Sequence, residues 1–186
     1  MNLPHLMEET AGVKEEELQD LKRALKLAKD THRVEGVCTG ALASLYQKSR
    51  VERICTELGL ECHSPLWGFD PEKHLRQLAI DGFSVVMVSV SALGLTEKWL
   101  GRNLDEPAIG ELVELARKYR FHAGLEGGEG ETFVLDCPLF SERLEITSSV
   151  KHWRGDSGYL EIIDAKLSQK PTRMAGEASF PKSGSG

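Results

Sequence analysis

Three carboxylates lie among four glycines between residues 124 and 132, in a run that reads GLEGGEGET. The carboxylates are Glu126, Glu129 and Glu131. Carboxylates this close repel one another, so the cluster suits Mg²⁺ binding, general-base catalysis or recognition of an amine or ammonium group. A polar run rich in glycine is equally typical of a flexible acidic surface loop. Composition alone leaves both interpretations open.

A second group of polar residues follows a short apolar run at residues 34–38. Thr39 and Gly40 form the expected turn, and a helical pattern begins soon after it. Ligands of open parallel sheets bind beyond the carboxyl ends of the strands, where a glycine admits close approach and a new helix presents free N–H groups. The residues that we expect to meet a ligand here are Thr39, Ser44, Tyr46, Gln47, Arg50 and Glu52. Arg50 and Glu52 also fit a surface ion pair.

Other residues carry weaker chemical signals. His122 precedes the acidic run and could act as a base, although lone histidines are usually structural or exposed. Cys62 and His63 are adjacent, and because neighbouring strand residues point to opposite faces, we expect no metal site there. None of the four cysteines forms a C-x-x-C pair, which favours free thiols in a reducing cytoplasm over disulfides.

Helices and strands alternate through the first half of the chain. The expected elements are helix 13–29, strand 34–38, helix 42–58, strand 60–67, helix 70–81 and strand 83–90. Asp70 followed by Pro71 is a helix start, and Gly59 is a helix end. The last strand is apolar almost throughout, which is typical of a strand buried on both faces. The alternation predicts a parallel, layered α/β sheet.

After residue 92 the pattern changes to a short helix, a longer amphipathic helix at 107–119, and strands at 133–135, 142–153 and 159–167. Pro, Gly, Ser and Lys then dominate. We predict a partial doubly wound parallel α/β domain over residues 1–92, a smaller C-terminal α+β domain over residues 93–167, and a disordered tail over residues 168–186.

Length and composition limit the class of protein. The chain has 186 residues, a formal net charge of -6 and 40% hydrophobic residues. Acidic and basic residues are interleaved without a basic stripe, which argues against direct binding of nucleic acid. No apolar run reaches membrane-spanning length, and the first residues lack the pattern of a signal peptide. We therefore expect a cytoplasmic globular protein.

Several of these motifs together resemble the diphthine–ammonia ligase family, in the adenine-nucleotide alpha-hydrolase-like superfamily. The resemblance runs from about Thr10 to Ile146. The matching pieces are residues 12–17 (GVKEEE) and 20–22, residues 39–41 with Ser44, Tyr46, Gln47, Arg50 and Glu52, residues 65–68 (PLWG), 94–95 and 99–102, and residues 126–132 with Asp136, Pro138, Leu139 and Phe140.

The resemblance implies an ATP-dependent amide ligase, with Mg²⁺ expected beside the ATP. In that family, ATP activates the carboxylate of diphthine, a modified histidine on translation elongation factor 2, and ammonia attacks the acyl adenylate. Diphthamide, AMP and pyrophosphate are the products. By analogy, the nucleotide side would comprise Thr39, Gly40, Ser44, Gln47, Arg50 and Glu52. The catalytic residues would be Glu126, Glu129 and Glu131. The substrate side would comprise Trp67, Gly127, Gly128 and Thr132.

Two departures from the family pattern matter. Such enzymes open with a strand and a Ser-Gly-Gly-Lys-Asp-Ser pyrophosphate loop, and this chain resembles the family without that first third or so. The family's Gly-Glu-Gly-Gly-Glu-Tyr-Glu-Thr reads LEGGEGET from Leu125 onward. A non-catalytic relative that binds a nucleotide or a protein therefore remains the alternative. Exposed sheet edges favour association into homo-oligomers.

Overall fold

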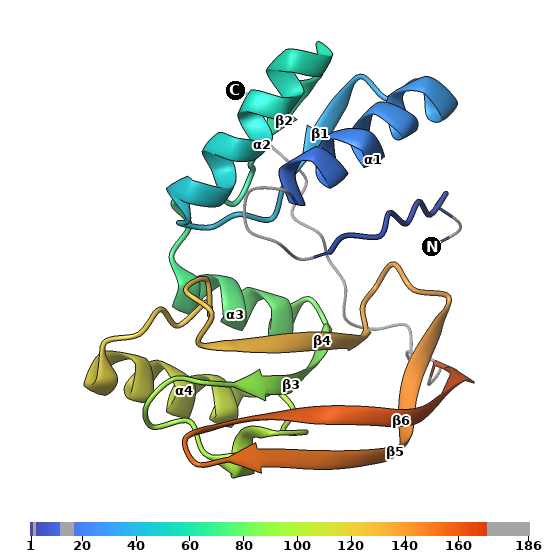
Figure 1. The fold of residues 1–186 in the computed structure, drawn as a ribbon. Helices are drawn as coiled ribbons and strands as arrows, with labels where there is room; N and C mark the ends of the chain where they lie inside the picture. The colour runs from blue at the N-terminus through green and yellow to red at the C-terminus, as the bar shows by residue number, and fades with distance from the viewer. Residues whose placement is uncertain (2, 12–16, 171–186) are drawn as a thin grey trace, which may run out of the picture.

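The computed structural model describes residues 1, 3–11 and 17–170. In chain order the elements are α1 (Glu17–His32), β1 (Gly36–Cys38), α2 (Leu45–Leu58), β2 (Glu61–His63), α3 (Pro71–Ile80), β3 (Ser84–Val90), the 3-10 helix η1 (Glu97–Trp99), α4 (Glu106–Tyr119), β4 (Gly130–Asp136), β5 (Glu142–Arg154) and β6 (Ser157–Gln169). They form two groups in Figure 1, an N-terminal unit (residues 17–63) above and a C-terminal unit (residues 70–170) below. The predicted start of the first helix at Val13 lies outside the described residues.

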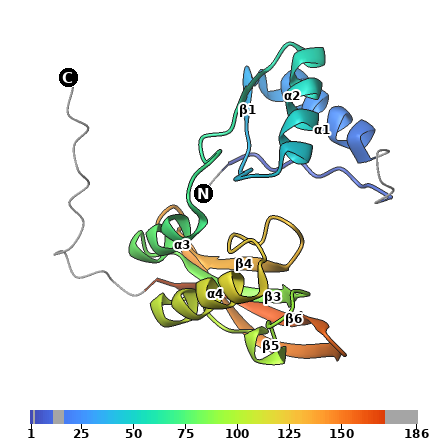
Figure 2. The ribbon, with the colours of Figure 1, turned by 90° about the vertical axis from the view of Figure 1, so that its left-hand side faces the viewer.

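The N-terminal unit is built on a small parallel sheet. β1 and β2 pair in parallel, with Val37 opposite Cys62, and α1 and α2 accompany them (Figure 2). Ile54 and Cys55 are the buried residues of α2, and α2 packs against β2 through this face. Gly59 ends α2 in the left-handed conformation with φ of 62°, as the sequence predicts. Two parallel strands of the expected sheet are therefore present.

The C-terminal unit is built on a four-stranded antiparallel sheet in the order β4-β3-β6-β5. α3 and α4 lie beside one another against it (Figure 2). The core between sheet and helices includes Met87, Trp99, Leu100, Ile109 and Leu112, each at most 2% exposed. This unit therefore contains the main hydrophobic core among the described residues.

β3 does not join the parallel sheet, so its predicted placement there was wrong. It pairs antiparallel with β4 on one side and with β6 on the other. A central strand of a covered antiparallel sheet is as apolar as a strand of a parallel sheet, so the run at 84–90 fits both arrangements. The predicted division at residue 92 consequently separates β3 from the sheet to which it belongs.

The β5–β6 hairpin confirms the two strands and the turn expected near the C-terminus. Its turn carries Gly155 with φ of 66°, and β6 pairs with β3 only through Gly158 and Tyr159. Ser168 and Gln169 belong to β6, although the sequence placed them in the tail. Lys170 is also described, whereas residues 171–186 of that predicted tail lie outside the described residues.

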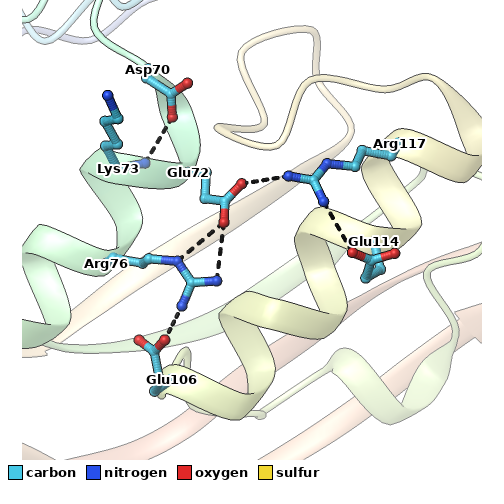
Figure 3. Close-up of polar contacts among 7 residues, drawn as sticks. All are labelled: Asp70, Glu72, Lys73, Arg76, Glu106, Glu114 and Arg117. Carbon is cyan, nitrogen blue, oxygen red and sulfur yellow. Dashed lines mark hydrogen bonds and ion pairs between the residues drawn. The ribbon is translucent and has the colours of Figure 1, made fainter.

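Ion pairs lock α3 to α4 (Figure 3). Glu72 on α3 accepts from Arg76 on the same helix and from Arg117 on α4, at 3.1 Å and 2.8 Å. Arg76 in turn pairs with Glu106 at the start of α4. Asp70 caps α3 by accepting from the Lys73 N–H at 2.9 Å. The network ties α3 to α4. No helix among the described residues is long and apolar enough to cross a membrane.

Candidate functional site

Three loops from both units meet at Leu42. This residue is 5% exposed and lies in the β1–α2 turn (residues 39–44). Its carbonyl accepts from the Gly68 N–H at 2.8 Å, and its own N–H donates to Glu126 Oε2 at 3.1 Å. A side chain at Gly124 would come within 3.0 Å of Leu42 Cδ1. The turn after β1, the turn after β2 and the acidic loop (residues 123–129) are thus packed together.

Glu126 belongs to the C-terminal unit but its carboxylate lies at the start of α2. Its Oε2 accepts from the backbone N–H groups of Leu42, Ala43 and Ser44 at 3.1, 3.2 and 3.3 Å. Groups at a helix start have no partner within the helix, and negative charge is favourable there. Ser44 is the N-cap and its hydroxyl accepts from Gln47 N–H at 3.4 Å. Glu126 therefore supplements the helix's own cap from another part of the chain.

Glu129 has a different environment from Glu126. Its Oε1 accepts from the His122 N–H at 3.0 Å, and its Oε2 accepts from the Gly127 N–H at 2.7 Å. The Glu129 carbonyl accepts from the N–H of Ser91 at 2.8 Å. Both carboxylate oxygens are thus used to fold the acidic loop onto itself, and the backbone ties that loop to the end of β3. The geometry favours a structural task for Glu129.

Glu131 and Thr132 lie on β4 beside a cavity. They are exposed and pair with Ser89 and Met87 of β3. The cavity has a volume of about 430 Å³. Its lining combines apolar residues of α3, β3 and the acidic loop with a few polar ones: Leu42, His74, Leu75, Leu78, Ala79, Phe83, Val85, Leu104, Ala123, Gly124, Leu125, Gly130, Glu131 and Thr132. The volume of this cavity lies within the range of small-ligand sites.

Gly130, at the start of β4, is a glycine that the local packing requires. A Cβ there would lie 2.6 Å from the Ser89 carbonyl oxygen, so no larger residue fits without moving the strands. Gly128 adopts φ of 84°, which favours glycine for a different reason. The Gly128 carbonyl accepts from the Ser91 hydroxyl at 2.6 Å. Gly130 thus serves close packing of the strands, and Gly128 serves the turn geometry of the acidic loop.

The residues expected on the nucleotide side are spread over the turn and α2. Thr39 joins the ends of both parallel strands, because its N–H donates to the His63 carbonyl at 2.8 Å and its hydroxyl lies 2.9 Å from the Ser64 hydroxyl. Gly40 is exposed, and a Cβ there would meet no atom within 4 Å. The protein itself does not require glycine at Gly40, and open space lies beside its backbone.

Farther along α2, the predicted residues contact their neighbours on the helix. The Arg50 guanidinium lies 3.1 Å from the centroid of the Tyr46 ring. Glu52 pairs with Lys48 at 3.7 Å, and the Lys48 ammonium lies 4.3 Å from the centroid of the Trp67 ring. Gln47 on this helix is exposed. Lys48 therefore links Trp67 to α2, a role that no sequence signal indicated.

The remaining candidates gain little support as chemical groups. His122 Nδ1 is buried and has no hydrogen-bond partner among the described residues, while the His122 backbone N–H donates to Glu129. Cys38, Cys62 and the other two cysteines are free. Burial raises the pKa of the Cys55 thiol to about 11, and the neighbouring Cys62 thiol adds to the effect. Residues 1, 3–11 and 17–170 contain no cluster of three metal-ligating side chains.

The arrangement brings some of the predicted site residues together and leaves others apart. Glu126 meets the β1–α2 turn directly, whereas Glu131 and Thr132 border the cavity. Leu42 and His74 line this cavity and were not expected from the sequence, which holds no local signal for either. The motif at residues 12–17 lies partly outside the described residues, which resume at Glu17.

Family profiles match both parts of the chain. Residues 1–62 match a family described as the diphthamide synthase N-terminal domain. Residues 70–168 match a family described as the diphthamide synthase C-terminal domain. The interval between the two matches falls in the connection between β2 and α3, so the profiles separate at the same place as the two units of the fold.

Curated proteins named diphthine–ammonia ligase are similar to most of this chain. The human protein is 43% identical over 137 residues, which are 72% of this chain and 50% of the human protein. The Schizosaccharomyces pombe protein is 42% identical over 159 residues, 84% of this chain and 26% of that protein. The Mus musculus protein is 38% identical over 155 residues, 83% of this chain and 58% of that protein. The chain thus spans about a quarter to three-fifths of these relatives.

Proposed function

This chain belongs to the diphthamide synthase family, and from that premise we propose that it acts in diphthamide biosynthesis as an ATP-dependent amide ligase. Its relatives are named diphthine–ammonia ligase. The observation that supports the proposal most is the contact of Glu126 with the β1–α2 turn. That contact places the acidic loop beside the residues proposed to hold the nucleotide.

The proposed reaction has two balanced steps. The carboxylate of diphthine on translation elongation factor 2 attacks the α-phosphorus of ATP, which forms an acyl adenylate and releases pyrophosphate. Ammonia then attacks the acyl carbon, so that a C–N bond forms and the C–O bond to AMP breaks. A proton is released as the amide forms. Adenylation is useful because a carboxylate is a poor electrophile, whereas AMP is a good leaving group.

The nucleotide fits best at the exposed side of the β1–α2 turn. Open space beside Gly40 allows close approach of a ligand to the backbone, and the hydroxyls of Thr39 and Ser44 belong to the same turn. Glu126 already accepts the N–H groups of Leu42, Ala43 and Ser44 before α2, so side chains and the Gly40 backbone would hold the nucleotide. Mg²⁺ is expected with ATP. Gln47, Arg50 and Glu52 would extend the site along α2.

The diphthine side chain would enter from the C-terminal unit. The cavity beside Glu131 and Thr132 has about the volume of a small-ligand pocket. We therefore assign Glu131 and Thr132 to the substrate. Gly127, Gly128 and Trp67, which are not part of the cavity lining, stay in the proposal as substrate-side residues. The four free cysteines suit a reducing cytoplasm, where we place the reaction. The proposal also includes association into homo-oligomers, because an unpaired sheet edge can pair with another copy of the chain.

The decisive assay combines the protein with ATP, ammonium and diphthine-bearing elongation factor 2. AMP and pyrophosphate should form only when all components are present. If neither AMP nor an ATP-induced thermal shift is observed, the ligase proposal fails and the non-catalytic binding protein becomes the better description. An ATP-induced shift without AMP would favour a nucleotide-binding relative.

Glu131 offers a sharper test than Glu129, whose removal would also unfold the acidic loop. We expect Glu131→Ala to abolish AMP formation while the ATP-induced thermal shift persists. Glu145→Ala is the matched control, because Glu145 pairs with Lys166 on the hairpin at 3.5 Å. Normal turnover in the Glu131 variant would contradict a catalytic or substrate-binding role for this carboxylate.

A further inference from the structure

Glu126 connects the two units of the protein. It follows Leu125 in the acidic loop, yet its hydrogen-bond donors are Leu42, Ala43 and Ser44, which precede α2. The donor and acceptor of the first of these bonds are 84 residues apart in sequence. The same side chain therefore fixes a loop of one unit to a helix of the other.

The number and type of donors make this contact strong for a single side chain. Hydrogen bonds to an ionised acceptor are about twice as strong as neutral ones. The first N–H groups of a helix otherwise need water or a cap, and the helix dipole adds favourable interaction with a negative charge. Ser44 caps α2 weakly, with its hydroxyl 3.4 Å from the Gln47 nitrogen. Glu126 thus holds the turn that leads into α2, while Ser44 caps the helix itself.

We propose that Glu126 is a positioning residue, a latch that holds the acidic loop on the β1–α2 turn, and that it does not transfer protons in the reaction. The inference deepens the proposed function and rests on it for the identity of the substrates. The resemblance places Glu126 with the catalytic carboxylates, but its geometry differs from that of Glu131, which borders the cavity. Oε2 accepts all three hydrogen bonds of the latch.

The latch acts through a loop that is already folded. Glu129 binds the N–H groups of His122 and Gly127, and its carbonyl anchors the loop to Ser91 after β3. A folded loop moves as one piece, so releasing Glu126 would displace the loop from the β1–α2 turn as a whole. The nucleotide side and the cavity would then lose their fixed separation. Loss of the latch should therefore affect nucleotide and acceptor together.

The test compares Glu126→Ala, Glu126→Gln and the control Glu145→Gln. Amide hydrogen exchange at residues 42–44 is measured first, because it needs no turnover. We expect Glu126→Ala to raise exchange at these three amides at least tenfold, while exchange in β3 stays unchanged. Glu126→Gln should show an intermediate effect, since its neutral oxygen still accepts hydrogen bonds. Unchanged exchange in Glu126→Ala would overturn the latch.

Turnover then separates a latch from a proton-transfer group. A latch predicts that Glu126→Gln restores at least a tenth of the wild-type rate and that the KM for ATP rises in Glu126→Ala. If Glu126 transfers a proton, Glu126→Gln should be as inactive as Glu126→Ala, and hydrogen exchange at residues 42–44 should stay close to wild type in both variants. This result would overturn the proposal. If the wild-type protein shows no turnover, the ligase proposal fails, and hydrogen exchange alone decides on the latch.

Discussion

The two units differ in how they are held together. The C-terminal unit packs a four-stranded sheet against two helices around Trp99, Met87 and Leu112. The N-terminal unit has two strands of three residues each. Among the most deeply buried large side chains of the described residues, Cys55 is the one that belongs to this unit. A two-stranded sheet is only marginally stable by itself. The C-terminal unit is therefore a scaffold, whereas the N-terminal unit depends on contacts at Leu42 and with Glu126.

This contrast fits the proposed division of labour. Binding elements are often drawn from the less stable parts of a protein, while a rigid scaffold positions them. The residues proposed for the nucleotide lie in the N-terminal unit, and the cavity and acidic loop belong mainly to the C-terminal unit. The contact at Leu42 then sets how the two halves of the site face one another.

Cavity-forming substitutions in the two cores should have the largest effects and should separate the units. Trp99→Ala is expected to destabilise the C-terminal unit by about 3–5 kcal/mol, because Trp99 is 2% exposed in its main core. Ile54→Ala is the matched change in α2, where Ile54 is 3% exposed. We expect it to raise hydrogen exchange in α1 and α2 while β3 stays protected. Equal loss of protection in both units for either variant would show that they unfold as one.

Gly130→Ala should have a smaller effect, localised at the junction of β4 and the acidic loop. The new methyl would meet the Ser89 carbonyl oxygen, and forced overpacking costs about 1–3 kcal/mol. Gly128→Ala is the comparison, since open space surrounds that position and only its positive φ of 84° opposes a side chain, at about 1–2 kcal/mol. Urea unfolding followed by circular dichroism measures both. A larger loss at Gly128 would contradict the packing argument.

The last effect concerns the Cys55 thiol and alkaline pH. Burial raises its pKa from 9.0 to about 11. Folding thus favours the neutral thiol, so its contribution to stability is complete below pH 9 and is lost as the pH rises towards 11. The free energy of unfolding of the N-terminal unit should fall over this range. In Cys55→Ala that part of the fall should disappear, and a difference between the two proteins that stays constant with pH would refute the effect.

Local sequence signals predicted the elements better than their assembly. Asp70 with Pro71 and Gly59 mark helix ends correctly, because caps depend on a few adjacent residues. The run at 84–90 predicts a buried strand but not its partners, since burial on both faces is shared by parallel and antiparallel arrangements. Sheet membership depended on contacts with β4 and β6, which are distant in the sequence.

The candidate site shows the same limit. The acidic run and the turn at Thr39 were each recognised, and the resemblance placed them in one site. The separate environments of Glu126 and Glu129 could not be predicted, because identical residues three positions apart acquire different partners only in the folded chain. Leu42 was missed for the same reason, since an apolar residue in a turn carries no signal of the loops that contact it.

The most direct test of the account is the transfer of nitrogen from ammonia to elongation factor 2. The protein is incubated with ATP, ¹⁵N-ammonium and diphthine-bearing elongation factor 2, and the modified histidine is analysed by mass spectrometry. The account predicts one ¹⁵N in a new amide for each AMP formed, and no label without ATP. AMP formation without label in the histidine, or the absence of both, would contradict it.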